Sequence, residues 1–182
     1  QELVALARAK PGSLNYASAG SGTAPHVSAE EFKLMTGIEM THVPYKGSAP
    51  AVSALLGGEV QVLFSSLGGL IPHVKAGRLR TLGVTGPKRT PSAPDIPTIA
   101  EAGVPGFEVS GWYGLAATAK TPAATVERLN AAVNKSLPEL RERYAGIGAD
   151  TAGGSAAEFN AYLKSETEKW ARVVKLSGAK PE

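Results

Sequence analysis

Hydrophobic residues along the chain alternate between helix-like and strand-like spacing almost to its C-terminal end. Apolar positions three or four residues apart predict helices, and short apolar or alternating runs predict strands. The helices predicted in the first half cover residues 1–10, 24–35, 49–56 and 67–76. The strands predicted between them cover residues 14–18, 40–45, 60–64 and 79–84. The third strand is apolar enough to be buried on both faces. This alternation, with short connections, predicts a mostly parallel α/β sheet with helices on both faces.

The C-terminal part of the chain begins with a proline-rich stretch and then becomes mostly helical. The elements predicted here are a short helix at 98–102, an extended segment at 107–117, helices at 122–137 and 138–144, and a short strand at 148–151. Thr121 is a plausible N-cap for the long helix. Ser155 and Glu158 have the spacing of a capping box, which predicts the start of a last helix after Ser155.

Two architectures are compatible with this order of elements. A length of 182 residues allows one large domain or a small two-lobed one. The first possibility is a single doubly wound domain. The second is a pair of lobes joined by extended crossover segments, which would lie at residues 14–18 and 109–114. No convincing internal repeat decides between them.

Composition excludes several classes of protein. A hydrophobic fraction of 43% suffices for a packed core, which excludes a disordered chain. The formal charge of +3 is too small and too dispersed to indicate nucleic-acid binding, and no aromatic and basic stripe accompanies it. The chain has no cysteine, so disulfides, zinc–thiolate sites and thiol catalysis are excluded. No apolar run approaches the roughly 20 residues that span a bilayer, so no direct membrane insertion is expected.

The first residues of the chain already have the pattern of a helix. No N-cap residue precedes them, and no signal peptide is present. We therefore expect that the beginning of the natural protein is missing.

A glycine- and hydroxyl-rich turn, residues 18–23, lies between a predicted strand and a predicted helix. Small residues let the backbone approach a ligand, and the first N–H groups of a helix lack internal partners. The helix dipole adds partial positive charge, so an anionic group can dock there. Neither the GxGxxG spacing of dinucleotide sites nor a Walker lysine is present. An ordinary tight turn, in which a serine or threonine caps the helix, remains the alternative.

Two further turns of the same kind follow the next two strands. Residues 45–48 again place a glycine and a serine at a helix start, and Lys46 can neutralise a carboxylate or simply be exposed. Residues 64–67 leave a strand taken as central in the sheet. Ligands of open parallel sheets gather at the C-terminal ends of the strands. We therefore expect the three loops to converge on one site.

The histidines and carboxylates do not form a recognisable catalytic or metal-binding pattern. His26 lies on the first turn of a predicted helix and has no nucleophile or carboxylate partner at an identifiable spacing. His42 and His73 are weaker candidates, and no pair of histidines has metal-ligand spacing. The GxSxG nucleophile motif is absent. The sequence thus predicts no catalysis and no cofactor. An α/β enzyme acting on an anionic substrate, with its catalytic group in a missing segment, is the alternative.

In order along the chain, several stretches resemble the TctC family, also called Bug receptors, of tripartite tricarboxylate transporters. The matching stretches are KPGSLNYASAGSGTAPH (10–26), VPYKG (43–47), LGGEVQVLF (56–64), PHVKAGRLR (72–80), PDIPTIAEAG (94–103) and GWYGL (111–115). Thr121-Pro122 and Leu129-Asn130 follow in register. The resemblance covers essentially the whole chain, which makes it far more specific than any single motif.

The resemblance implies a periplasmic-binding-protein-like α/β fold of type II, with two lobes that close on a ligand. It implies one complete lobe at residues 12–110 and a remnant of the other lobe at 111–182, with 1–11 as a helix end and crossover. It also implies a periplasmic location, capture of a small carboxylate and delivery to a membrane permease. Family members are longer than this chain, and the missing part would hold the export signal and half of the ligand clamp.

Within the family, one ligand carboxylate is held by backbone donors and water on two facing loops. Matching residues of this chain make up the candidate ligand-binding set, which is Ser18, Gly20, Ser21, Gly22, Thr23, His26, Tyr45, Lys46, Gly47, Ser48 and Ser65. Many members carry an aspartate at the position of Ser65. The uncharged serine of this chain therefore favours a ligand without a positively charged amine. Elements of an incomplete lobe, such as residues 112–117, would expose apolar surface, so self-association is expected.

Overall fold

A three-stranded parallel sheet lies at the centre of the protein, which a computed structural model describes for residues 1–146 and 148–177. The strands are β1 (Asn15–Ser18), β2 (Thr41–Pro44) and β3 (Val62–Leu63), in the order β2-β1-β3. In the register, Tyr16 lies beside His42 on one side and Val62 on the other. The parallel sheet confirms the expected class. The third strand is shorter than predicted and lies at an edge, so the expectation that it is central is wrong.

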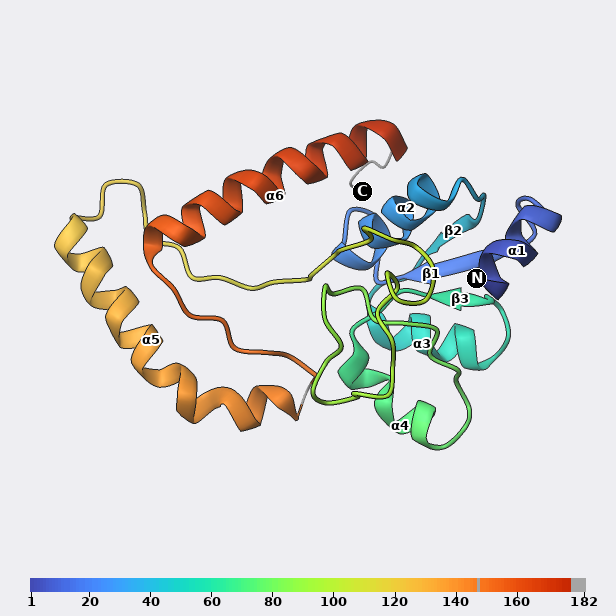
Figure 1. Ribbon diagram of the computed structural model, residues 1–182, viewed down its shortest axis with the longest axis horizontal. Helices are drawn as coiled ribbons and strands as arrows, with labels where there is room; N and C mark the ends of the chain where they lie inside the picture. Colours follow the sequence, from blue (N-terminus) through green and yellow to red (C-terminus); the bar gives the residue numbers. More distant parts are fainter. Residues whose placement is uncertain (147, 178–182) are drawn as a thin grey trace.

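Helices cover both faces of this sheet, as the alternating pattern predicted (Figure 1). On one face, Tyr16 packs in a core with α1 (Glu2–Ala9) and α2 (Ala24–Thr36), closed by Phe107 and Val109. On the other face, Ala17 packs against α3 (Ser48–Leu56). Successive strand residues point to opposite faces, so the adjacent residues Tyr16 and Ala17 of β1 pack in the cores on opposite sides of the sheet.

Helix α2 begins and ends where the sequence indicates. Thr23 is its N-cap residue, and Gly37 ends it with a φ of 63°, the left-handed conformation expected of a terminal glycine. Its apolar stripe is only partly buried. Phe32 lies in the core, but Leu34 and Met35 are about 40% exposed.

Three predictions in the middle of the chain differ from the structure, the first only in part. The helix predicted at 67–76 is a 3-10 turn, η1 (Leu67–Gly69), followed by α4 (Ile71–Lys75), because two glycines weaken the first part and Pro72 suits a first turn. The strand predicted at 79–84 forms one isolated bridge, from Val84 to Thr98. The residues predicted as a helix at 98–102 are a bridge residue, Thr98, followed by turns at 99–103, and Gly103 has a φ of 114°, outside the helical range.

The C-terminal part differs from prediction in its breaks. One helix, α5 (Ala123–Ala145), continues through Pro138, because good helix formers flank the proline. Its N-cap is Pro122, not Thr121. No strand forms at 148–151, where the N–H of Ala149 caps α5 by donating to the Tyr144 carbonyl (3.0 Å). The capping box of α6 (Ala156–Ser177) is confirmed, since the Glu158 N–H donates to Ser155 Oγ (3.1 Å).

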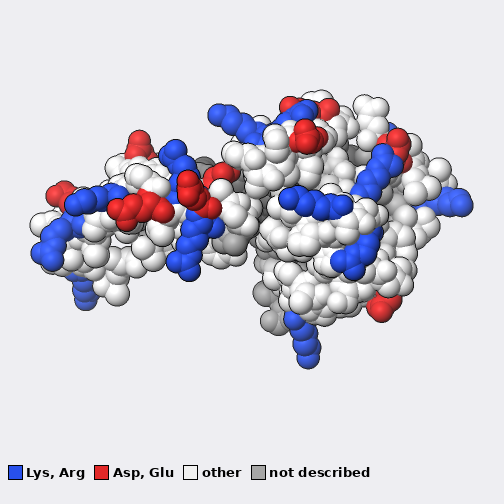
Figure 2. Space-filling view, turned by 90° about the horizontal axis from the view of Figure 1, so that it is seen from below, with Lys and Arg blue, Asp and Glu red and all other residues white. Residues whose placement is uncertain are grey.

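Helices α5 and α6 extend away from the sheet as an arm (Figure 1). No described residue of α5 is buried, and Val173 is the buried residue of α6. The C-terminal half of α6 returns to the body, where Trp170 packs against the core and Arg172 lies 3.6 Å from Glu31 on α2. Figure 2 shows basic and acidic side chains interspersed on the arm and scattered on the body, with no continuous basic patch on the face in view.

Candidate functional site

The three glycine- and serine-rich loops lie together at the C-terminal edge of the sheet. The Tyr45 N–H donates to the Ser18 carbonyl (3.2 Å), and the Gly47 N–H donates to the Ala19 carbonyl (3.1 Å). On the other side of β1, the Phe64 N–H donates to the Ala17 carbonyl (3.3 Å), which places the start of the third loop at the same edge. The expected convergence of the loops is therefore confirmed.

The first loop, residues 18–23, is held in shape by its own side chains. Ser18 is fully buried, and its Oγ accepts the Gly20 N–H (3.2 Å). The Thr23 hydroxyl donates to the Gly20 carbonyl (2.6 Å). The Gly22 N–H donates to Nδ1 of His26 (3.0 Å), one turn further along the chain. These bonds fold the loop tightly over the start of α2.

Gly20 is required by the conformation and by the neighbouring loop. Its φ is 131°, which disfavours any residue with a side chain. A Cβ there would lie 3.4 Å from the Tyr45 carbonyl oxygen, so the two loops pack backbone to backbone. The small residues of the motif thus bring two loops together, as well as leaving room for a ligand.

A column of three rings lies beneath the first loop. The rings of His26 and His42 stack with centroids 4.0 Å apart at 8°, and the His42 ring stacks on Tyr16 at 4.8 Å. Nε2 of His42 lies 2.7 Å from Ser18 Oγ. At the far end, the Tyr16 phenol donates to Glu30 (2.5 Å), which also pairs with Lys33 (2.8 Å).

Sequence reasoning did not place Tyr16, Glu30 or His42 in the site. The available signal was positional, because Tyr16 and His42 lie on strands that turn out to be neighbours in register. That pairing becomes visible only once the strand order is known.

Burial shifts the pKa of two of these rings, Tyr16 and His26. It raises the pKa of Tyr16 far above its ordinary value, and the nearby Glu30 carboxylate adds to the effect. For His26, burial lowers the pKa, an effect opposed by Glu30 and reinforced by Lys33. The structure therefore favours a neutral His26, whose Nδ1 lone pair accepts the Gly22 N–H.

The second loop presents backbone more than side chains. The Tyr45 phenol donates to Glu59 (3.3 Å), and partial burial followed by Glu59 raises its pKa. Lys46 is exposed. Gly47 is the N-cap residue of α3 with a φ of 112°, and Ser48 is the first, exposed residue of that helix.

Of the other candidates, Ser21 and Ser65 are partly buried in the first and third loops. The structure thus brings the eleven candidates to one edge, although His26 and Ser18 support the loops from beneath.

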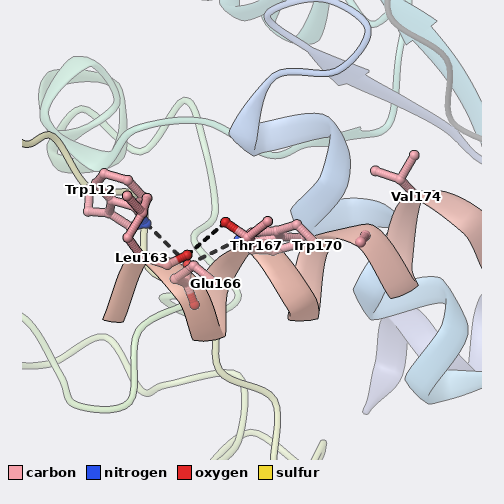
Figure 3. A pocket seen from close by; sticks show the side chains of 7 residues that line it. Trp112, Leu163, Glu166, Thr167, Trp170 and Val174 are labelled. Atoms are coloured by element: carbon pink, nitrogen blue, oxygen red, sulfur yellow. Dashed lines mark hydrogen bonds between the residues drawn. The ribbon is translucent and has the colours of Figure 1, made fainter. Parts of the chain in front are cut away.

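A groove of about 450 Å³ lies elsewhere, along α6 (Figure 3). Its walls are mostly apolar, and Glu166 accepts hydrogen bonds from the indole N–H groups of Trp112 (3.2 Å) and Trp170 (3.0 Å). The anionic Glu166 would repel a carboxylate, so this groove does not suit an anionic ligand. We assign the candidate site to the loops for that reason.

Metal sites and membrane-spanning helices are two other features to consider in this chain. Within residues 1–146 and 148–177, no cluster of His, Asp or Glu has the arrangement of a metal site. In the same part of the chain, no helix combines the length and apolar character needed to cross a membrane.

Comparison with known proteins identifies the family. The model of the TctC family, described as the tripartite tricarboxylate transporter family receptor, matches residues 1–179. The chain belongs to the TctC family. A TctC relative, the UPF0065 protein in the tcbD-tcbE intergenic region of Pseudomonas sp. (strain P51), is 43% identical over 95% of this chain and 52% of its own length. The chain therefore spans about half of that relative.

Solved structures of similar proteins share the fold. The structure of R. palustris Rpa4515 with adipate has a TM-score of 0.85 at 39% identity, covering 100% of this chain and 61% of that one. MatC (Rpa3494) from Rhodopseudomonas palustris with bound malate has a TM-score of 0.77 at 30% identity, covering 95% and 60% respectively. These findings confirm the TctC resemblance and the periplasmic-binding-protein-like α/β class, of which the chain covers about 60% in each structure.

Proposed function

We propose that this chain is part of a periplasmic solute-binding receptor, which captures a small carboxylate for a tripartite tricarboxylate transporter. The observation that carries the proposal is the meeting of the loops at 18–23 and 45–48, backbone to backbone, at the N-terminal ends of α2 and α3. Relatives with the same fold are described with adipate and with malate. Residues 12–110 form one lobe in this proposal, and residues 1–11 and 111–182 belong to the other.

The chemistry of the loops suits a carboxylate. Helix N-termini carry partial positive charge and N–H groups without intrahelical partners. The exposed Ser48 hydroxyl adds a donor, and Lys46 adds a formal positive charge. Ser65 supplies no negative charge, so in our proposal the ligand is a di- or tricarboxylate without an ammonium group.

A catalytic alternative has one observation in its favour. Ser18 Oγ lies 2.7 Å from His42 Nε2, the geometry of a nucleophile with its base. Against it, Ser18 is fully buried, and its hydroxyl is engaged with Gly20. A buried hydroxyl cannot meet a substrate, so we propose that the contact is structural and that the protein binds without catalysing a reaction.

Calorimetric titration tests the function. We expect adipate, malate or citrate to bind a version extended upstream of Gln1 to the length of its relatives, whereas the uncharged diamide of adipate does not bind. The Lys46→Gln variant should bind the acids about threefold to tenfold more weakly, and Lys88→Gln, an exposed control in another loop, should bind like the unaltered chain. Turnover of an acid would favour the enzyme, and absence of binding by every acid would contradict the receptor.

The location and protein partners of the receptor are part of the same proposal. Receptors of this family serve transporters, so we infer a periplasmic location and contact with permease subunits.

We also propose self-association of the present chain through residues 111–120, which are all exposed, including Tyr113 and Leu115. Sedimentation velocity should show concentration-dependent dimers that are lost in the Tyr113→Ser, Leu115→Ser double variant. A monomer at all concentrations would contradict this.

A further inference from the structure

The two stacked histidines come from different elements and contact the same loop. His26 lies in the first turn of α2, and His42 lies in β2. Their rings are nearly parallel, with centroids 4.0 Å apart. His26 is 5% exposed and His42 is partly buried, so His26 lies in the interior below the loop.

Each histidine is bonded to a different end of the loop. Nε2 of His42 lies 2.7 Å from Ser18 Oγ, which in turn accepts the Gly20 N–H. Nδ1 of His26 accepts the Gly22 N–H at 3.0 Å. The ring stack therefore links the start of the loop to its end and limits how far the two can separate.

We propose that His26 and His42 are positioning residues for carboxylate capture, and that protonation of His26 releases the Gly22 end of the loop and weakens binding. The inference rests on the function proposed above and concerns the regulation of the same site. The pair acts through the loop and does not contact the ligand.

The physical reason is the direction of one hydrogen bond. A neutral imidazole can accept at Nδ1, but the imidazolium carries protons on both nitrogens and can only donate. The Gly22 N–H would then face another donor. A charged His26 would also lie directly against the His42 ring, whose centroid is 4.0 Å away.

The charged groups around His26 influence whether its neutral or its protonated form is favoured. From α2, Glu30 favours the cation and Lys33 opposes it. From β1 comes Tyr16, whose phenol already donates to Glu30, and from β2 comes His42. Arg172 of α6 faces the neighbouring Glu31 of α2. Burial outweighs Glu30, so the pKa of His26 lies below its ordinary value.

The sign follows from that direction. A histidine with a lowered pKa in the ordered loop stabilises that loop while it is neutral, and the stabilisation is lost as the pH falls. Affinity for a carboxylate should therefore fall toward acid pH. Simple attraction between a cationic histidine and the anion predicts the opposite, so the sign of the pH dependence separates the two.

The first test needs no ligand. In an NMR titration of the chain between about pH 5 and 8, the range in which histidines change charge, the Gly22 amide shift should follow the His26 ring with the same midpoint. The Gly37 amide, at the far end of α2, should not follow it. The His73→Asn variant removes the signal of the third histidine, which lies outside the stack, and should leave the pH-dependent change of the Gly22 amide shift in place. A Gly22 amide shift that does not change at the midpoint of the His26 titration would overturn the proposal.

The second test uses adipate as the probe. Over the same pH range, affinity should fall about threefold to tenfold more in the unaltered protein than in His26→Asn, which cannot titrate. Near pH 8, His26→Leu should bind about threefold to tenfold more weakly, and His26→Asn should recover part of that loss because its amide oxygen can accept the Gly22 N–H. Affinity that rises toward acid pH relative to His26→Asn would overturn the proposal. If adipate binds at no pH, the receptor function is in question, and the NMR titration still decides the coupling.

Discussion

The body of the protein, residues 2–110, and its arm, residues 111–146 and 148–177, differ in how fully their apolar side chains are buried. In the body, side chains such as Tyr16, Phe107 and Val109 are almost completely buried. In the arm, residues 111–120 are all exposed, and α5 has no buried residue. Both parts have amphipathic sequence patterns. An apolar stripe along a helix therefore shows that this face can be buried, but it does not show that another element packs against it.

The arm is held by contacts between its own elements and, at the C-terminal half of α6, by contacts with the body. The Gly154 N–H donates to Asn134 Oδ1 (3.0 Å), and Trp112 packs edge-on against Phe159 at 5.6 Å. Because most helical stability in proteins comes from tertiary packing, we expect the arm to open more readily than the body. The matched structures are longer than this chain, which covers 61% and 60% of them.

The largest difference in stability loss between body and arm should come from two aromatic residues, one on each side of the boundary at residue 110. Phe107→Ala should lower the free energy of unfolding by about 3–5 kcal/mol, because it leaves a cavity in the core. Tyr113→Ala removes a fully exposed ring and should change it by less than about 0.5 kcal/mol. Urea unfolding followed by circular dichroism measures both. Similar losses would mean that the arm is packed in solution.

The ring column predicts a dependence on alkaline pH. Tyr16→Phe leaves Glu30 without its phenol donor and should lower stability by about 1.5–3 kcal/mol near neutral pH. Burial raises the pKa of Tyr16 in the folded state, so its contribution is present below the ordinary tyrosine pKa of about 10 and is lost as the pH rises above it.

The alkaline loss of stability should accordingly be shallower in Tyr16→Phe than in the unaltered chain. Tyr113→Phe, the control on the arm, should keep the original slope. Parallel slopes for all three proteins would remove Tyr16 from the explanation.

Two adjacent valines of α6 test how firmly the arm is joined to the body. Val173 is completely buried where α6 meets the body, and Val174 is 37% exposed. Val173→Ala should cost about 1.5 kcal/mol for the two methyl groups withdrawn from the interior. Val174→Ala should cost clearly less. If thermal unfolding shows equal losses, then α6 is not docked as described.

The sequence predicted the elements that local chemistry decides. The turn at 18–23, the end of α2 at Gly37 and the capping box at Ser155 each depend on residues a few positions apart, and each is confirmed. Strand alternation also gave the parallel sheet correctly.

Its errors arose where distant contacts decide. Residues 79–84 had the pattern of a strand, but Val84 bonds to the proline-rich loop, so the sheet ends at β3. Similarly, the convergence of the loops could be predicted from parallel topology, whereas the His26–His42 stack could not. That contact depends on which strand lies next to β1, and nothing in the local sequence specifies it.

The smallest effect concerns the capping box, and it decides whether arm and body unfold together. Ser155→Ala removes the hydroxyl that bonds Glu158, which should destabilise the start of α6 by about 1 kcal/mol. Hydrogen bonds from Ser155 lower the pKa of Glu158, so the difference from the unaltered chain should shrink as the pH falls through that pKa. Ser165→Ala, on the exposed face of the same helix, is the control. If the arm frays independently, hydrogen exchange at the start of α6 accelerates while the global unfolding midpoint stays fixed. A midpoint that falls in step with the exchange would show that the two regions form one cooperative unit, despite their different packing.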